Sequence, residues 1–534
     1  MTGPTLWGTM KLLKRSLILS CGVSASALVL AINAGADSFT IVNGQTVTTT
    51  QTLDTTGNVG TVEEGGVIDV LTGNGIEGTA NGVTVNNAGS VTSGDNNGIF
   101  VLGESTVTNS GTATGGSYGI AADGDNNKIT NSGTATGGSY GILADGSGNT
   151  ITNSGTATGY YWGIAALGDN NTITNSGTAT GSDYGIAADG NGDTITNSGK
   201  IIGGEAGVYF YRTDNTLTLL AGSNVQGILD LGPKVPTLVP GYNTLVIGRR
   251  LSTALTYLGG EGVILDTSGM PFVSSGGVLA VVDPTLFSAE GDMLNDLTRS
   301  LADLVDARLG SARSGHGAAN MAAAAPTGIV PTADVPDAEE PQMVIWAAGI
   351  GNYRSEGSNG MYDGFDSTLG GFAIGADGVL SSGTRLGGFA GASFASLNTD
   401  AGTQAIDADS YYAGLYAGFT MSEAFLNLAL TGGYTSQSTS RDVLNNMVAG
   451  GVEQAKGDPN GIFISPSATI GTDIATGGMI FTPSLRARYA GLFMDSYDEN
   501  GSTADLSIDS RSVNLFDLRG QVAFAIKPIV TKKR

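Results

Sequence analysis

The sequence predicts an all-β protein in which a right-handed parallel β-helix is followed by a transmembrane antiparallel β-barrel. The chain of 534 residues contains 85 glycines and only 13% charged residues, a balance that fits extended β-structure better than an ordinary soluble enzyme. The tripeptide Asn-Ser-Gly recurs every 22 residues in the N-terminal half, which indicates stacked structural units. From Val344 onward, apolar and polar residues alternate over long segments, which is typical of barrel strands.

The composition excludes several classes of protein. With 24 basic and 48 acidic residues and a net charge of −24, the chain lacks the basic excess that nucleic-acid binding needs. One cysteine excludes a disulfide scaffold and a cysteine-ligated metal site. His316 is the single histidine, so it is the only candidate for the base that a serine or cysteine hydrolase with a catalytic histidine needs. We expect no cofactor, no metal ion and no catalytic residues.

The first residues predict an export signal. A basic cluster at 11–15 precedes the apolar run 17–32, and small residues then lead to a cleavage position between Ala36 and Asp37. We therefore expect residues 1–36 to be a signal peptide that directs the chain to the general export machinery.

Two alternatives remain open at this end of the chain. Met10 stands directly before the basic cluster and would be the initiator if the first nine residues are an extension of the gene model. An uncleaved membrane anchor is the rival of the cleaved signal. The apolar run is shorter than the ~20 residues that span a bilayer, which favours cleavage.

A repeat of 22 residues follows, and its composition favours a β-helix with one coil per repeat. The segments are rich in Thr, Ile, Gly and Asn and lack long helix formers. A leucine-rich repeat is excluded because the units lack the leucines it requires. Gly-Ile recurs in phase with Asn-Ser-Gly. The asparagines that begin the tripeptide are Asn109, Asn131, Asn153, Asn175 and Asn197.

Residues one period apart must stack in columns along the axis of such a fold. Two columns are apolar and predict the core; they run from Val107 to Ile195 and from Ile120 to Val208. The asparagine column predicts amide hydrogen bonds along the stack. The aromatic column comprises Tyr118, Tyr140, Trp162 and Tyr184. We expect these rings to pack against neighbouring coils, and a sugar-binding platform is the alternative.

Acidic residues at the corners of the coils are candidates for calcium binding and for catalysis by paired carboxylates. The run 123–127 resembles a calcium loop, but glycine is missing at its sixth position. Asp123, Asp145 and Asp189 share a column that Leu167 interrupts. Paired carboxylates of this kind would serve a glycan hydrolase or lyase, but the repeats contain no long insertion that would build a cleft.

The chain changes character beyond residue 230. Segments 244–247 and 278–282 predict closing strands, and a helix is expected from Asp283-Pro284 to Leu309. Residues 310–341 are rich in Ala, Gly, Ser and Pro and predict a linker. The apolar stripe of the helix comprises Leu294, Leu297, Leu301, Leu304 and Val305.

The C-terminal segments alternate with a period of two. Arg486 and Arg488 lie on one face, opposite the apolar face of Leu485, Tyr489 and Phe493. Facing lipid at mid-bilayer, each arginine would cost ~2 to 4 kcal/mol, so we expect them to face a polar lumen. A soluble β-sandwich with one wet face is the alternative. The candidate strands lie near 344–354, 366–380, 384–398, 405–420, 423–438, 461–475, 478–496 and 504–526.

Several runs resemble type V autotransporters. They are Val281–Thr285, Trp346–Gly349, Gly375–Asp377, Ser410–Tyr416 and Thr482–Tyr489. The resemblance implies a barrel in the bacterial outer membrane, a helix threaded through its lumen, and a passenger delivered to the cell surface. It also implies outer-membrane lipid and the barrel assembly machinery as partners.

The chain departs from this family in one respect. The family barrel has twelve strands, whereas this sequence offers eight and ends at 527–534 without the terminal aromatic strand. An unclosed sheet cannot satisfy its edges in lipid. We therefore expect a truncated copy whose barrel lacks its last strands.

The resulting expectation is an outer-membrane autotransporter with a non-enzymatic, adhesive passenger. Its ligand would be a host surface or a glycan, and a β-helical glycan hydrolase or lyase is the alternative. The expected organisation is a signal peptide at 1–36, a β-helical passenger at 37–282, a helix and linker at 283–343, and an incomplete barrel at 344–534.

Overall fold

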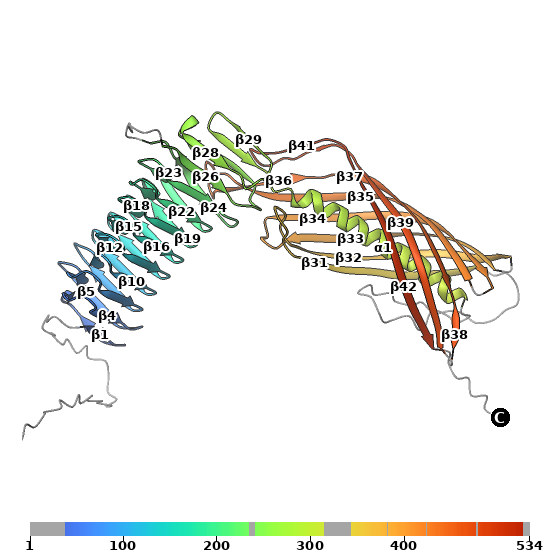
Figure 1. Ribbon diagram of the computed structural model, residues 1–534, viewed down its shortest axis with the longest axis horizontal. Helices are drawn as coiled ribbons and strands as arrows, with labels where there is room; N and C mark the ends of the chain where they lie inside the picture. Colours follow the sequence, from blue (N-terminus) through green and yellow to red (C-terminus); the bar gives the residue numbers. More distant parts are fainter. Residues whose placement is uncertain are drawn as a thin grey trace, which may run out of the picture.

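The computed structural model shows a parallel β-helix at one end of an elongated molecule and an antiparallel sheet holding one long helix at the other (Figure 1). The predicted fold class, a parallel β-helix followed by an antiparallel β-region, is confirmed. The expected signal peptide and its cleavage position between Ala36 and Asp37 lie outside the described part of the chain. The structure describes residues 38–233, 241–313, 343–381, 383–422, 424–476 and 479–526.

The β-helix is built from three rows of parallel strands, and each regular coil adds a strand to each row. The first row comprises β1 (Phe39–Ile41), β4 (Val59–Val62), β7 (Thr84–Asn87), β10 (Thr106–Asn109), β13 (Lys128–Asn131), β16 (Thr150–Asn153), β19 (Thr172–Asn175), β22 (Thr194–Asn197), β24 (Thr216–Leu219), β26 (Asn243–Ile247) and β28 (Val263–Asp266). The second comprises β2 (Thr46–Val47), β5 (Val67–Val70), β8 (Ser90–Ser93), β11 (Thr112–Gly115), β14 (Thr134–Gly137), β17 (Thr156–Gly159), β20 (Thr178–Gly181) and the starts of β23 (Lys200–Phe210) and β25 (Asn224–Asp230).

The third row holds the segments that carry the aromatic column and Gly-Ile. It comprises β3 (Gln51–Leu53), β6 (Ile76–Gly78), β9 (Ile99–Leu102), β12 (Tyr118–Asp123), β15 (Tyr140–Asp145), β18 (Trp162–Leu167), β21 (Tyr184–Ala188), the ends of β23 and β25, and β27 (Thr253–Leu258). A 3-10 turn, η1 (Gly260–Gly262), follows β27. The antiparallel hairpin of β29 (Phe272–Ser275) and β30 (Val278–Val281) then pairs with β27.

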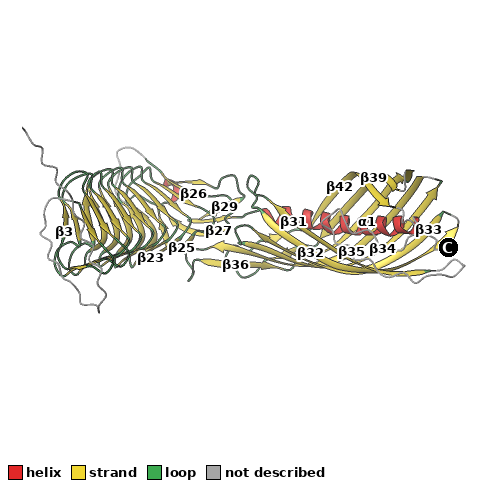
Figure 2. Cartoon of the chain, turned by 90° about the horizontal axis from the view of Figure 1, so that it is seen from below, coloured by secondary structure: helices red, strands yellow, loops and turns green. Residues whose placement is uncertain are grey.

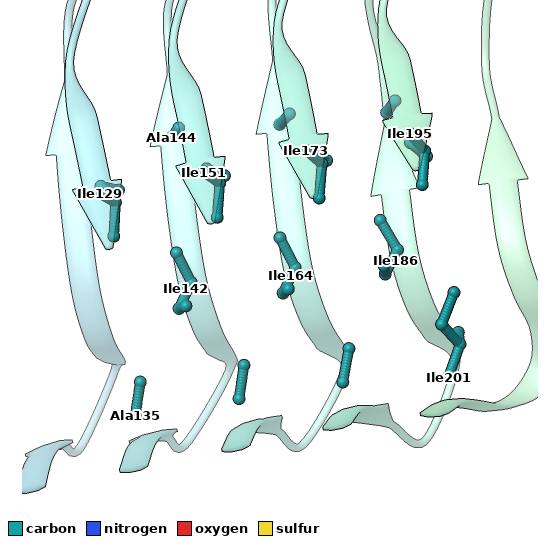
Figure 3. Close-up of a cluster of buried hydrophobic side chains, with 14 of the residues drawn as sticks. Ile129, Ala135, Ile142, Ala144, Ile151, Ile164, Ile173, Ile186, Ile195 and Ile201 are labelled. Carbon is teal, nitrogen blue, oxygen red and sulfur yellow. The ribbon is translucent and has the colours of Figure 1, made fainter. Parts of the chain in front are cut away.

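The register between coils is one repeat of the sequence. Val107 pairs with Ile129, and Ile129 with Ile151, each 22 residues further along. The same holds for Ile120, Ile142 and the residues after them. Both apolar columns are almost fully buried and line the interior of the coils (Figure 3). Each such side chain stabilises the fold by about 1.5 to 3 kcal/mol relative to exposure.

The glycine of Asn-Ser-Gly is fixed by the close approach of adjacent coils. A Cβ on Gly155 would lie 2.0 Å from the carbonyl oxygen of Gly133, one coil earlier. Gly177 meets Gly155 at the same distance. A side chain at this corner would therefore push the coils apart, which explains why the tripeptide keeps glycine.

The C-terminal region is a curved sheet of eight long antiparallel strands, each paired with the next. They are β31 (Val344–Glu356), β32 (Phe365–Ser381), β33 (Thr384–Thr399), β34 (Gln404–Met421), β35 (Ala424–Leu444), β37 (Asn460–Thr472), β39 (Met479–Met494) and β42 (Arg511–Ile526). No pairing joins β31 to β42 in the described residues, so these strands form an open sheet and not a closed barrel.

Two strand boundaries differ from the sequence prediction. Strand β35 continues to Leu444 instead of ending near 438, because its last residues pair with β36 (Val452–Gly457) in a projecting hairpin. The last strand begins at Arg511 and not near 504, because β40 (Tyr497–Asp498) and β41 (Ser507–Ile508) pair separately. A short strand, β38 (Ile474–Thr476), also pairs with β39.

Helix α1 (Thr285–Arg313) lies along the concave face of this sheet (Figure 2). Its N-terminus is capped by Asp283, whose Oδ1 accepts hydrogen bonds from the backbone N–H and the hydroxyl of Thr285 at 3.0 and 2.6 Å. The helix continues four residues beyond the predicted Leu309 into the expected linker. This extension is stabilised by Arg313, whose guanidinium lies 3.5 Å from the ring centre of Phe425. Residues 314–341 of that linker lie outside the described part.

Replacing the repeat glycine should loosen the β-helix locally. In Gly155→Ala the added methyl group meets a backbone oxygen that cannot rotate away, so we expect a loss on the order of 1 to 3 kcal/mol of unfolding free energy. Denaturant unfolding of the full chain, followed by circular dichroism, measures this. Gly262→Ala is the matched control because a Cβ there meets no atom within 4 Å. Equal midpoints for the two variants would contradict the close-approach explanation.

Candidate functional site

The predicted asparagine column lies inside the β-helix and forms a continuous amide ladder. Nδ2 of Asn131 donates to Oδ1 of Asn153 at 2.7 Å, and Nδ2 of Asn153 donates to Oδ1 of Asn175 at 2.8 Å. Each amide also donates to a backbone carbonyl, as Asn131 does to Thr156 at 3.1 Å. Asn109 donates to Asn131, and Asn175 to Asn197, in the same way. All five side chains are fully buried, so this column stabilises the coils and does not face a ligand.

A second buried column at another corner was not identified from the sequence. Oδ1 of Asn149 accepts the backbone N–H of Asn127 at 2.7 Å, and Oδ1 of Asn171 accepts that of Asn149 at 2.8 Å. Asn215 and Asn243 continue the pattern near the end of the β-helix. The signal was present in the sequence, because positions 127, 149, 171, 193 and 215 follow the same 22-residue period.

One member of this second column is a carboxylate. Oδ1 of Asp193 accepts the backbone N–H of Asn171 at 2.7 Å, and Oδ2 accepts that of Gly190 at 3.1 Å. The residue is 1% exposed. Burial raises the pKa of Asp193 to about 6, against the lowering effect of these hydrogen bonds.

The aromatic column is a stack of rings whose faces are covered by one another. Ring centres are 5.1 Å apart for Tyr118 and Tyr140, 4.6 Å for Tyr140 and Trp162, and 5.7 Å for Trp162 and Tyr184. Tyr209 extends the stack at 4.3 Å from Tyr184. The sequence did not predict the extension to Tyr209, because this residue lies 25 residues after Tyr184 and not 22. The rings thus pack between coils, and a column of exposed ring faces for sugar stacking is not present.

Two other tyrosines form an exposed aromatic pair. Tyr160 and Tyr161 are 63% and 45% exposed and meet edge to face at 4.9 Å. They occupy the corner where neighbouring repeats have small or acidic residues. The backbone N–H of Asp183 donates to the carbonyl of Tyr161 at 3.0 Å, and that of Glu205 donates to the carbonyl of Asp183 at 2.9 Å. Tyr161, Asp183 and Glu205 therefore succeed one another along this corner.

In the acidic column expected at the other end of these strands, Leu167 separates Asp189 from Asp123 and Asp145. Asp123 and Asp145 are register neighbours, and Leu167 follows. Burial and the charge of Asp123 raise the pKa of Asp145. Asp189 lies 3.9 Å from Arg212. Within the described ranges, no group of three or more Asp, Glu, His or Cys side chains is placed to hold a metal ion.

The polar face predicted for the C-terminal strands lies against α1. Arg486 is 2% exposed and pairs with Asp303 and Asp306 of the helix at 2.6 and 2.7 Å. Arg488 is equally buried and donates hydrogen bonds to Asn295 and Thr298. Both arginines thus point into the concave side of the sheet, as their alternation with apolar residues predicts.

Ion pairs hold the helix to the sheet over most of its length. They join Glu290 to Arg511, Asp292 and Asp296 to Arg354, Arg299 to Asp517, Asp303 and Asp306 to Arg486, Arg308 to Asp377, and Arg313 to Asp473. The predicted apolar stripe packs between them against residues such as Trp346 and Phe389. The indole N–H of Trp346 donates to the hydroxyl of Tyr416 at 2.8 Å, and that hydroxyl donates to Asp377 at 2.7 Å.

The convex face of the same sheet is apolar and exposed. In β34, Tyr411 and Leu415 are 56% and 70% exposed, whereas Tyr412 and Tyr416 are buried. Large apolar side chains cover this face from β32 to β42. Among them are Phe372, Ile374, Phe394, Leu428, Leu430, Ile462, Ile470, Leu485, Phe493, Phe516, Leu518, Val522 and Phe524. A continuous apolar surface of this kind marks an interaction site.

Among the residues that the structure describes, no helix combines the length and the apolar composition needed to cross a membrane.

Comparison with known protein families decides what this sheet is. Residues 345–526 match the family model of the autotransporter beta-domain. The C-terminal region is an autotransporter β-domain. An autotransporter β-domain preceded by a β-helix supports a function in autotransporter secretion at the outer membrane.

Solved structures and curated proteins were also compared. The chain is similar to the translocator domain of the autotransporter NalP from Neisseria meningitidis, with 18% identity and a TM-score of 0.32. The similarity covers 45% of this chain and 74% of that one. The comparison with curated proteins finds no match.

The buried carboxyl group of Asp193 should make the β-helix more stable in mild acid. Its pKa is raised from 3.8 to about 6 in the folded chain, so its stabilising contribution is complete below about pH 3.8 and is lost as the pH rises through 6. Asp193→Asn removes the buried charge. At pH 7.5 we expect the variant to gain on the order of 1 to 3 kcal/mol over the natural chain.

Below pH 4 this gain should vanish or reverse, because the variant lacks the acceptor for Gly190. Thermal unfolding midpoints of the full chain across this pH range measure the effect. Asp54→Asn, at an exposed corner, serves as the control. A pH dependence that persists in Asp193→Asn would show that another group is responsible.

Proposed function

We propose that this autotransporter inserts its β-domain in the bacterial outer membrane and displays its β-helix on the cell surface as a non-enzymatic adhesin. The observation that carries the membrane part is the sheet itself, with exposed apolar side chains on one face and buried arginines on the other. That distribution suits lipid outside and a polar interior. Outer-membrane lipid, the general export machinery and the barrel assembly machinery are the partners that this function requires.

Regular geometry supports adhesion as the role of the β-helix. The coils from β10 to β22 keep one register without interruption, so they present a long repeated surface and no cleft. Residues 37–230 contain 18 acidic and 3 basic residues. This charge would repel anionic polymers and bare anionic membranes.

We place the ligand contact at Tyr160 and Tyr161. Tyrosine side chains combine an apolar ring with a hydroxyl group, which suits them to interfaces. The neighbouring carboxylates of Asp183 and Glu205 accept hydrogen bonds from hydroxyl groups and disfavour anionic sugars. This combination fits a glycan that carries no acidic groups.

Surface display can be tested with intact cells. A protease-cleavable epitope inserted in an exposed corner of residues 105–199 should be cut by external protease while a periplasmic marker stays intact. The chain should also sediment with the outer membrane, because its apolar convex face needs lipid. An epitope that is cut only after cell lysis would contradict surface display.

Ligand binding can be tested separately with the displayed chain and a panel of neutral and acidic glycans. Tyr160→Ser with Tyr161→Ser should reduce binding to neutral glycans at least tenfold, because the exposed rings are lost, and should leave surface levels unchanged. The control is Tyr242→Ser, which removes a tyrosine of similar exposure, 49%, on another coil. Equal binding by both variants would contradict this site, and cleavage of the glycan would favour the hydrolase or lyase alternative.

A further inference from the structure

A hairpin of the β-domain projects beyond the sheet to the end of the β-helix. The first part of β35 pairs with β37, whereas residues 439–444 pair with β36 instead. The segment between these strands, residues 445–451, forms the tip of the hairpin. In Figure 1, β36 lies next to the last coils of the β-helix.

The last complete coil lacks part of its next strand. Strand β25 pairs with β27 only through Leu229 and Asp230, so the start of β25 is left without a following coil. The hairpin tip lies there. The backbone N–H of Gly227 donates to the carbonyl of Asn446 at 2.8 Å, and Nδ2 of Asn224 donates to the carbonyl of Gly450 at 2.6 Å.

Asn446 also joins this coil to β27. Its Nδ2 donates to the carbonyls of Gly227 and Thr256 at 3.0 and 2.8 Å. Its Oδ1 accepts the backbone N–H of Thr256 at 2.8 Å. The side chain is 1% exposed. One asparagine of the β-domain therefore performs the task that the asparagine columns perform between coils.

The hairpin also contributes to the core of the β-helix. Leu444 is 2% exposed and belongs to the same apolar cluster as the stacked isoleucine columns. Its backbone N–H donates to the carbonyl of Ser252 at 2.9 Å, and it forms a parallel bridge with Thr253. The hairpin thus replaces a coil both in hydrogen bonding and in packing.

The base of the hairpin is braced by the segment between β39 and β42. Arg441, 1% exposed, forms an ion pair with Glu499 and donates to the carbonyl of Ala504 at 3.1 Å. Nδ2 of Asn445 donates to the hydroxyl of Thr503 at 2.9 Å. These contacts lie within the β-domain, so they hold the tip in place independently of the β-helix.

We propose that residues 444–450 are a docking site that caps the end of the β-helix, with the coil of β25 and β27 as its partner. A solenoid needs a cap because its last coil has unpaired backbone groups and open core. Here the cap is supplied by the β-domain. The last coil is complete only while it is docked on the hairpin.

Hydrogen exchange of the purified full chain tests this proposal without depending on surface display or ligand binding. In Asn446→Ala we expect amides of residues 224–230 and 253–258 to exchange at least tenfold faster than in the natural chain. Amides of the central coils, residues 106–197, should not change. Met447→Ala is the matched control, because Met447 lies at the same tip but is 57% exposed.

Asn224→Ala approaches the same contact from the β-helix and leaves the β-domain intact. It should also accelerate exchange near Gly227. This second variant keeps the test valid even where Asn446→Ala disturbs the fold of the β-domain itself. Unchanged exchange at residues 224–230 in both variants would overturn the proposal. Acceleration in Met447→Ala equal to that in Asn446→Ala would overturn it as well.

Discussion

The hydrogen-bonded register between coils is the constraint on which the β-helix depends. Every strand must pair with the strand one coil before and one coil after it, so the chain returns to the same position after each repeat. Adjacent coils approach too closely at the Asn-Ser-Gly corner for any side chain on Gly155. Buried amides such as Asn153 then add hydrogen bonds from one coil to the next, here to the carbonyl of Thr178. Burial of isoleucines adds the stabilising energy, but the register decides where they lie.

A structure built in this way is less well satisfied in hydrogen bonding at its two ends than in its interior. Pairing satisfies the interior coils and leaves the outermost coil with backbone groups that have no neighbour. At the C-terminal end of the β-helix, the β29–β30 hairpin covers one part of the last coil. The hairpin of β35 and β36 covers another through Asn446. The boundary between the two regions is therefore a packed and hydrogen-bonded interface as well as a covalent connection.

The β-domain follows a different rule, in which charge is kept on the concave side. Helix α1 brings carboxylates such as Asp303 and Asp306 to an arginine on β39, and its apolar residues fill the space between the ion pairs. Buried charges are tolerated only when they are paired and hydrogen-bonded. The convex side instead exposes large apolar side chains such as Leu415.

The sequence alone determined the features that repeat. A constant interval places identical side chains above one another, and a period of two divides a strand into two faces, so the asparagine ladder, the isoleucine columns and the inward arginines were predictable. The second amide column followed the same interval and was open to the same reasoning. The sequence also contained enough information to place eight strands and one helix within a few residues, except where a hairpin changed a boundary.

Only the tertiary structure decided which residues meet across long separations. That Asp306 pairs with Arg486, or that Asn446 completes the coil of Gly227 and Thr256, depends on how the helix and the hairpin are set in the whole molecule. The extension of the aromatic stack to Tyr209 and the exposed pair at Tyr160 and Tyr161 were also not predicted from the spacing. Periodicity fixes which side chains share a column or a face, because it is a local property of the backbone. Partners joined by packing have no such period, since their approach is set by every element between them.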